Sequence, residues 1–106
     1  MPLLIRGDGK GRYCPVIVCD HCGQEITDGR DGNYQWQVGR DGEIVNGKIY
    51  FTHKECCRSF EQANGGRRCW MFTGLECLPV FLVRNLKVDW DRAKKTARFM
   101  ATLESG

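Results

Sequence analysis

The chain has 106 residues, of which 27% are charged and 42% are hydrophobic, and its formal net charge is +3 at pH 7. This length predicts one domain, and the composition is ordinary for a soluble globular protein. The net charge is too small to indicate nucleic-acid binding by itself, and no apolar run approaches the length of a membrane span. The charge is mildly uneven, because residues 1–46 carry five Lys/Arg and seven Asp/Glu whereas residues 47–106 carry eleven and six.

Seven cysteines are an odd number for a framework of disulfides, and no secretory signal opens the chain. The short apolar run at residues 1–5 is interrupted by Arg6 and then by glycines. In a reducing cytosol, clustered cysteines are more often metal ligands than disulfides. We therefore expect a cytoplasmic protein whose cysteines bind metal.

The chain is predicted to open with a flexible leader at residues 1–12, rich in glycine and charge. Residues 13–18 are β-branched and aromatic and predict a strand. That strand leads into Cys19-Asp-His-Cys22, where two intervening residues let one turn direct both sulfurs at one ion. Gly23 supplies the positive φ that such a turn needs. Residues 24–27 then predict a short return strand.

The middle of the chain predicts a small antiparallel sheet. Residues 28–33 contain two Asp/Gly turn signals and predict a loop. Apolar and polar residues alternate over residues 34–38, as in a half-buried strand. Further strands are predicted at residues 44–45 and 48–51, between Asp-Gly and Asn-Gly turns.

A helix is predicted from Thr52 to about Ala63, ended by an Asn-Gly-Gly sequence. Thr52 and Glu55 have the spacing of a capping box. His53 and Cys56 are three residues apart, so they would share one face of the first helical turn. The positive end of this helix would favour the thiolate form of Cys56.

The last third of the chain is predicted to be helical. Thr73 and Glu76 have the spacing of a second capping box, with a helix following to Leu86. Asp89 is the expected N-cap of another helix. Both helices are expected to pack against the rest of the domain. The apolar stripe of the last helix comprises Trp90, Ala93, Ala97, Met100 and Leu103.

Three thiols and one imidazole are the ligands of a closed structural zinc site, so Cys19, Cys22, His53 and Cys56 are the predicted ligands of one Zn²⁺. Cys57 could replace Cys56, although H-x2-C fits the helical turn better. The other cysteines are predicted to be small buried hydrophobic residues. They are Cys14, Cys69 and Cys77.

The order of knuckle, hairpin and ligand-bearing helix resembles a treble-clef zinc finger over residues 13–63. The C-x2-C…H-x2-C order is also similar to the first half of a LIM domain. The gap of 30 residues is longer than in a LIM module, and no second ligand quartet follows. We therefore expect an α+β fold, with a treble-clef-like zinc module at residues 13–66 and a helical extension at 67–106. This resemblance implies a zinc site but no particular role.

Catalytic interpretations find little support in the sequence. Cys19-Asp-His-Cys22 matches the C-x-H-C form of some thiol–disulfide oxidoreductases, but the βαβ context is missing. A His-dependent nuclease needs a histidine besides its metal ligands, and only His21 would remain, at the exposed apex of the knuckle. No phosphate-binding loop, Ser-His-Asp set or paired-carboxylate motif is present. The sequence therefore predicts a protein that is not an enzyme.

A binding or adaptor module is the predicted function, with another protein or a second copy as partner and no small-molecule substrate. Nucleic-acid binding is the alternative, and thiol–disulfide exchange the third. The aromatic residues are expected mostly in the core, but in an open groove they would mark a protein-binding site. A solvated helix face is the simpler explanation for the basic residues near the C-terminus. The candidate nucleic-acid contacts are Arg67, Arg68, Arg92, Lys95 and Arg98.

Overall fold

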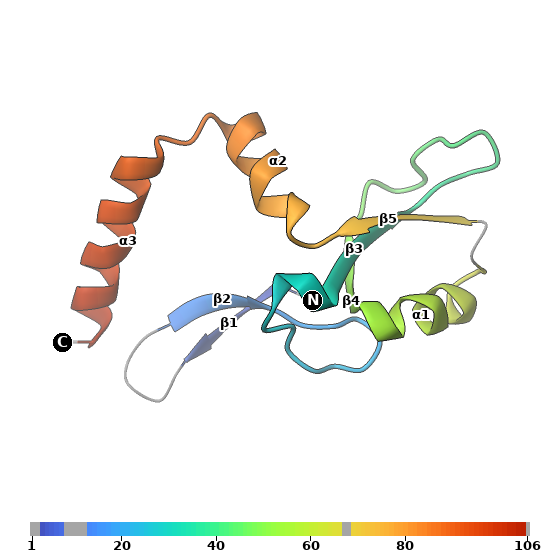
Figure 1. Ribbon diagram of the computed structural model, residues 1–106, viewed down its shortest axis with the longest axis horizontal. Helices are drawn as coiled ribbons and strands as arrows, with labels where there is room; N and C mark the ends of the chain where they lie inside the picture. Colours follow the sequence, from blue (N-terminus) through green and yellow to red (C-terminus); the bar gives the residue numbers. More distant parts are fainter. Residues whose placement is uncertain (1–2, 8–12, 67–68, 106) are drawn as a thin grey trace.

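The computed structural model describes residues 3–7, 13–66 and 69–105. Within these residues the chain forms two small antiparallel sheets and three α-helices (Figure 1). The predicted α+β class is therefore confirmed. The strands are β1 (Leu3–Gly7), β2 (Tyr13–Ile17), β3 (Gly32–Gln37), β4 (Tyr50–His53) and β5 (Trp70–Gly74). The helices are α1 (Cys57–Ala63), α2 (Cys77–Leu86) and α3 (Trp90–Ser105), with 3-10 turns η1 (Gly29–Asp31) and η2 (Lys54–Cys56).

The three-stranded sheet has the order β4-β3-β5, with β3 in the centre. Tyr34 of β3 pairs with Phe51 of β4 on one side and with Thr73 of β5 on the other. At the start of β3, an added Cβ on Gly32 would lie 2.8 Å from Leu75 and 3.0 Å from Ile26. Glycine at this position therefore lets the strand approach the core closely.

The hydrophobic core lies where the sheet meets the Cys19–Cys22 turn and the start of α2. Its buried side chains are Cys19, Ile26, Tyr34, Phe51 and Leu75. A second apolar cluster joins β4, α1 and β5, where the rings of Tyr50, Phe60 and Trp70 have centroids 5.2 to 5.5 Å apart. Burial of these groups supplies the main apolar contribution to the fold.

The expected leader contains a strand, because β1 pairs along β2 from Leu3↔Ile17 to Gly7↔Tyr13. The remainder of that segment, residues 1–2 and 8–12, lies outside the described residues. The sequence of β1 does not alternate between apolar and polar residues, because its apolar side chains are exposed. For this reason, and because a glycine-rich sequence follows, the strand was not predicted. The predicted strand at 44–45 is reduced to one bridge, between Ile44 and Val38.

The predicted capping box at Thr52 is wrong. Thr52 lies inside β4 and is fully buried, and its hydroxyl faces the sheet instead of capping a helix. The chain leaves β4 through η2, and α1 begins only at Cys57. The predicted end of this helix at Ala63 is confirmed.

The C-terminal third is not entirely helical, because β5 occupies residues 70–74 and contains Thr73. The second predicted capping box is therefore wrong as well, and α2 begins later, at Cys77. The predicted cap of α3 is confirmed, since the backbone N–H of Arg92 donates to Asp89 Oδ1 at 3.0 Å. The strand is favoured over a helix because β3 offers it a full ladder of backbone partners.

The expected packing of α3 against the rest of the domain is not seen. The helix stands apart from both sheets (Figure 1), and its stripe residues Trp90, Ala93, Ala97 and Met100 are exposed. The stripe makes α3 an amphipathic helix. However, α3 follows α2 in the chain and lies away from the core. Among the described helices, none is both long and apolar enough to cross a membrane.

A buried polar network joins the sheet to α1. Gln35 and Thr52 are 0% exposed, and Glu61 is 3% exposed. Gln35 Nε2 donates to Glu61 Oε2 at 3.1 Å, and Thr52 Oγ1 donates to Gln35 Oε1. The Cys57 thiol also donates to Glu61 Oε2, at 3.6 Å. Gln35 thus satisfies a donor and an acceptor that are both shielded from water.

We expect Gln35→Leu to lower the free energy of unfolding by about 3 kcal/mol, because the Thr52 hydroxyl and the Glu61 carboxylate each lose a buried partner. Denaturant unfolding followed by circular dichroism measures this loss. Gln62→Leu is the matched control, since Gln62 is exposed on the same helix as Glu61, and it should change stability by no more than about 0.5 kcal/mol. Equal losses in the two variants would contradict the role of the network.

Candidate metal centre

The four predicted ligands lie together in the structure. The Sγ atoms of Cys19, Cys22 and Cys56 and a ring nitrogen of His53 all lie within 4.8 Å of one another. They come from two segments, with 30 residues between Cys22 and His53. This group could hold one metal ion, which the spacing of the sequence predicted.

The first pair is positioned by a tight turn after β2. Gly23 N–H donates to the Cys19 carbonyl at 3.0 Å, and Cys19 N–H donates to the Gln24 carbonyl at 2.8 Å. Gly23 has φ of 75°, as predicted, which residues with a Cβ rarely adopt. The expected return strand is reduced to one bridge, between Glu25 and Val18. The turn aims both sulfurs to the same side and leaves His21 exposed at its apex, as predicted.

The second pair lies at the junction of β4 and α1. His53 is the last residue of β4, and Cys56 is the last residue of η2. A 3-10 turn has three residues per turn, so residues i and i+3 lie on the same side. The predicted convergence of His53 and Cys56 is therefore present, but a 3-10 turn produces it instead of an α-helical turn.

Asp20 links the two ligand segments. Its Oδ2 accepts from Phe51 N–H at 2.8 Å, and its own backbone N–H donates to the Phe51 carbonyl at 2.7 Å. Phe51 is two residues before His53 on β4. Asp20 therefore fixes the Cys19–Cys22 turn relative to the strand that carries the imidazole. No local pattern in the sequence indicates this role, because the hydrogen bond joins residues that are 31 positions apart.

Three backbone N–H groups surround the Cys19 sulfur. Those of His21, Cys22 and His53 donate to Sγ at 3.4, 3.5 and 3.4 Å. Burial raises the pKa of this thiol, but the N–H donors together lower the pKa to about 7 from the ordinary 9.0. Donors from both ligand segments therefore favour a thiolate at Cys19.

Cys56 has the opposite tendency. Burial and the neighbouring sulfurs of Cys19 and Cys22 raise the pKa of its thiol to about 12. The sequence predicted a thiolate favoured by the end of a helix, and this is wrong, because burial, and after it the neighbouring sulfurs, raise the pKa of the Cys56 thiol. A bound divalent cation would reverse the balance, since it attracts each thiolate that the others repel.

The spacing of the group fits a tetrahedral ion. Bond lengths of roughly 2.3 Å to sulfur and 2.0 Å to nitrogen place a sulfur and a nitrogen ligand about 3.5 Å apart. Cys22 Sγ and His53 Nδ1 are 3.4 Å apart, which is also within hydrogen-bonding distance. Four ligands would fill the coordination sphere, so the group fits a structural ion and would leave no site for substrate.

The sequence left Cys57 as an alternative ligand to Cys56. In the structure, Cys56 belongs to the candidate metal group and Cys57 does not. The Cys57 side chain is buried and contacts Glu61 Oε2, as part of the polar network. The prediction of burial is wrong for Cys14 and Cys77, which are exposed, and Cys69 is half-buried. The position of β1–β2 and α2 at the surface accounts for the two exposed thiols.

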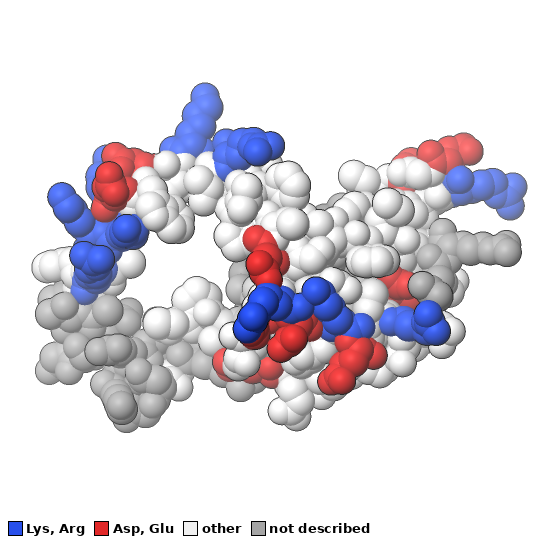
Figure 2. Space-filling model, viewed as in Figure 1, with Lys and Arg blue, Asp and Glu red and all other residues white. Residues whose placement is uncertain are grey.

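The candidate nucleic-acid contacts Arg92, Lys95 and Arg98 lie on α3 and are exposed. Arg67 and Arg68 lie outside the described residues. Figure 2 shows Lys and Arg side chains along α3 and at its corner with α2, with Asp and Glu side chains between them. The basic face is therefore exposed but mixed in charge.

Sequence analysis did not predict the extensive apolar surface of the C-terminal part. In α2, every residue except Pro79, Arg84 and Asn85 is apolar, yet none is buried. Val80 is 57% exposed and Leu86 is 69% exposed. A helix that is apolar on all sides is usually buried, so the composition of α2 was the available signal. Of the aromatic residues expected mostly in the core, Phe72, Phe81 and Trp90 are exposed.

The chain matches no protein-family model, no curated protein and no solved structure. The metal-binding group and the surface around it therefore carry the functional argument.

We expect Asp20→Ala to raise the dissociation constant for a divalent ion about tenfold, because the Cys19–Cys22 turn loses its side-chain hydrogen bond to β4. Competition with a chromophoric chelator measures this change. Asp20→Asn should lose less affinity, since an amide oxygen can still accept from Phe51 N–H. Asp41→Ala, in an exposed loop, is the control and should bind like the unaltered protein. Identical affinities for the Ala and Asn variants would refute the positioning role.

Proposed function

We propose that the metal is one structural Zn²⁺ and that the ligand-bearing part is a treble-clef-like zinc module. Three thiolates with one imidazole suit Zn²⁺ better than the oxygen-seeking cations. The succession of Cys19–Cys22 turn, paired strands and α1 supports the proposed module. The zinc would join the turn to the β4–α1 junction and supply stability that a chain of 106 residues gains only in part from its core.

We expect protein purified without added metal to contain about one zinc per chain, and Cys56→Ser to contain almost none and to unfold. Elemental analysis and circular dichroism measure the two effects. Cys77→Ser is the matched control, because its thiol is exposed on α2 and is not a member of the ligand group. Zinc retained by Cys56→Ser, or lost equally from Cys77→Ser, would contradict the assignment.

The proposed role of the module is non-enzymatic binding of a protein partner. The observation that carries this proposal is the exposed apolar surface of α2 and of the groove beside it. The groove has a volume of about 590 Å³, and its lining is mostly apolar. Contiguous apolar surface exposed to water is typical of a protein-binding site. None of the four residues of the metal group lines the groove, although Cys19 and Cys56 pack in the same core cluster as its floor residue Phe51.

Nucleic-acid binding is the second candidate, favoured by the exposed Arg92, Lys95 and Arg98 of α3. Cations on one helix can contact successive phosphates. Asp89 and Asp91 on the same part of the chain oppose this role by repelling phosphate. Thiol–disulfide exchange is the third candidate. It requires an accessible Cys19 thiol, but Cys19 is buried in the core.

We expect the zinc-loaded protein to select apolar peptides from a displayed library, and Leu82→Glu to lose this binding at least about tenfold, because a carboxylate would enter the apolar groove. Isothermal titration with a selected peptide measures the affinity. Asn85→Glu adds the same charge on α2, at a residue that does not line the groove, and should bind like the unaltered protein.

Three outcomes separate the candidates. Peptide binding lost only in Leu82→Glu supports the protein-binding role. Retention on a DNA or RNA column that falls steeply from about 50 to about 200 mM salt, with no peptide selected, favours nucleic-acid binding instead. Disulfide exchange by the metal-free protein that Cys19→Ser abolishes would favour the oxidoreductase.

A further inference from the structure

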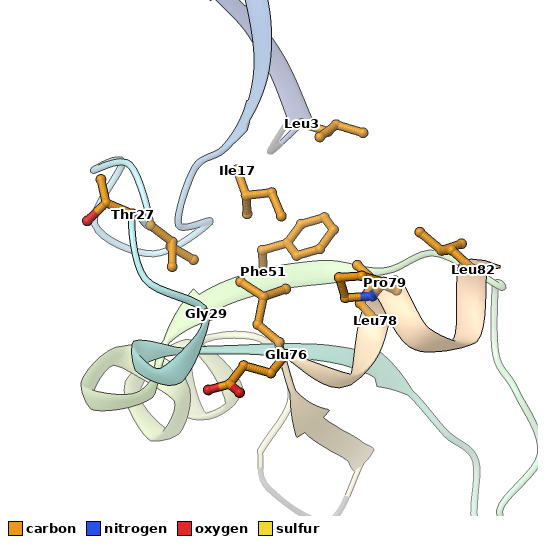
Figure 3. A pocket seen from close by; sticks show the side chains of 11 residues that line it. Leu3, Ile17, Thr27, Gly29, Phe51, Glu76, Leu78, Pro79 and Leu82 are labelled. Atoms are coloured by element: carbon orange, nitrogen blue, oxygen red, sulfur yellow. The ribbon is translucent and has the colours of Figure 1, made fainter. Parts of the chain in front are cut away.

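An open apolar groove lies between the β1–β2 hairpin, β4 and α2 (Figure 3). Phe51 forms its floor, Leu3 and Ile17 approach from the hairpin, and Pro79 and Leu82 approach from α2. The side chain of Leu3 is 57% exposed and that of Leu82 is 47% exposed. The groove therefore has three apolar walls, and its open side faces solvent.

The same chain carries a projecting segment with an apolar stripe. We call residues 77–105, which contain α2 and α3, the arm, and residues 13–66 the head. On the stripe of α3, Trp90 is 57% exposed and Met100 is 47% exposed. The two helices have 10 and 16 residues. This length matches the roughly 20–30 residues that each partner contributes to a stable interface.

The arm is basic, whereas the rest of the chain before it is neutral overall. The arm contains six Lys/Arg and three Asp/Glu, a net charge of +3, and residues 1–76 contain ten of each kind. Negative charge gathers at the Gly29 end of the groove. There Glu76 Cγ would lie 3.0 Å from a Cβ on Gly29, Asp28 and Asp31 flank the same turn, and Arg30 pairs with Asp28 at 2.8 Å. The basic face of α3 is complementary to this acidic edge.

The arm leads away from the groove of its own chain. Lys87 ends α2 in the left-handed conformation with φ of 53°, and Asp89 caps α3, so only residues 87–89 separate the helices. Figure 1 shows α3 on the far side of α2 from the three-stranded sheet. The groove and the stripe thus face solvent separately, although their chemistry is complementary.

From this complementarity we infer that the occupant of the groove is the arm of a second copy of this chain. The apolar stripe of α3 from one copy lies in the groove of the other, with its basic residues near Asp31 and Glu76. The exchange is reciprocal, so each copy gives one arm and receives one, and a closed two-fold dimer results. This inference rests on the proposed protein-binding role, because it names the partner for the same groove.

Sedimentation equilibrium of the zinc-loaded full chain tests the inference. The unaltered protein should form a dimer, and either Met100→Glu in the stripe or Leu82→Glu in the groove should weaken the dimer at least about 100-fold, because each places a carboxylate in the apolar contact. Asn85→Glu, on α2 but outside the lining of the groove, is the matched control and should remain dimeric. Zinc content and circular dichroism verify that each variant folds.

Mixing the two disrupted variants identifies the contact. Leu82→Glu retains an intact α3 and Met100→Glu retains an intact groove, so a heterodimer keeps one of the two reciprocal contacts. The mixture should therefore associate more strongly than either variant alone. If α3 of one copy packed on α3 of the other instead, Leu82→Glu alone would still form a dimer and mixing would add nothing.

Each result decides the inference. A folded, zinc-loaded protein that stays monomeric at all concentrations overturns it, as does a dimer that neither variant weakens or that mixing fails to restore. If such a monomer still binds selected peptides through Leu82, the groove takes a different protein and the proposed function survives. If it binds neither a second copy nor any peptide, both proposals fail.

Discussion

The structure depends on bringing two distant segments to one point. Cys19 and Cys22 reach it from a turn after β2, and His53 and Cys56 reach it from the end of β4 and the following 3-10 turn. Burial and the neighbouring sulfurs both oppose a thiolate at Cys56 and raise the pKa of its thiol. A divalent cation bound to the group would turn the repulsion between thiolates into attraction, and its binding would then be coupled to folding.

Around this point, hydrogen bonds over long sequence separations set the positions of the ligands. Asp20 holds the turn against β4 with two bonds to Phe51. Gln35 joins the sheet to α1 through Thr52 and Glu61, next to the strand end that carries His53. The hydrogen bonds of Gln35 are buried, and the side-chain hydrogen bond of Asp20 is partly buried. Both sets therefore contribute specificity as well as stability. The metal-binding group is therefore supported on both sides by the fold.

The C-terminal arm has a different character. Its helices are well specified by local signals, including the Asp89 cap, yet they leave large apolar side chains in water. Such exposure costs free energy for an isolated chain, and covering it supplies a driving force for association. The molecule thus combines a head with a buried core and an arm whose apolar side chains remain exposed.

Local sequence determined the four residues of the candidate metal group, the Gly23 turn, the central strand and the end of α1, because each depends on neighbouring residues or a fixed spacing. Tertiary structure decided what depends on distant partners. The β3 edge made residues 70–74 a strand, and the sheet drew Thr52 into β4. It also decided the exposure of α2 and α3, since an apolar stripe has the same sequence whether or not a surface covers it.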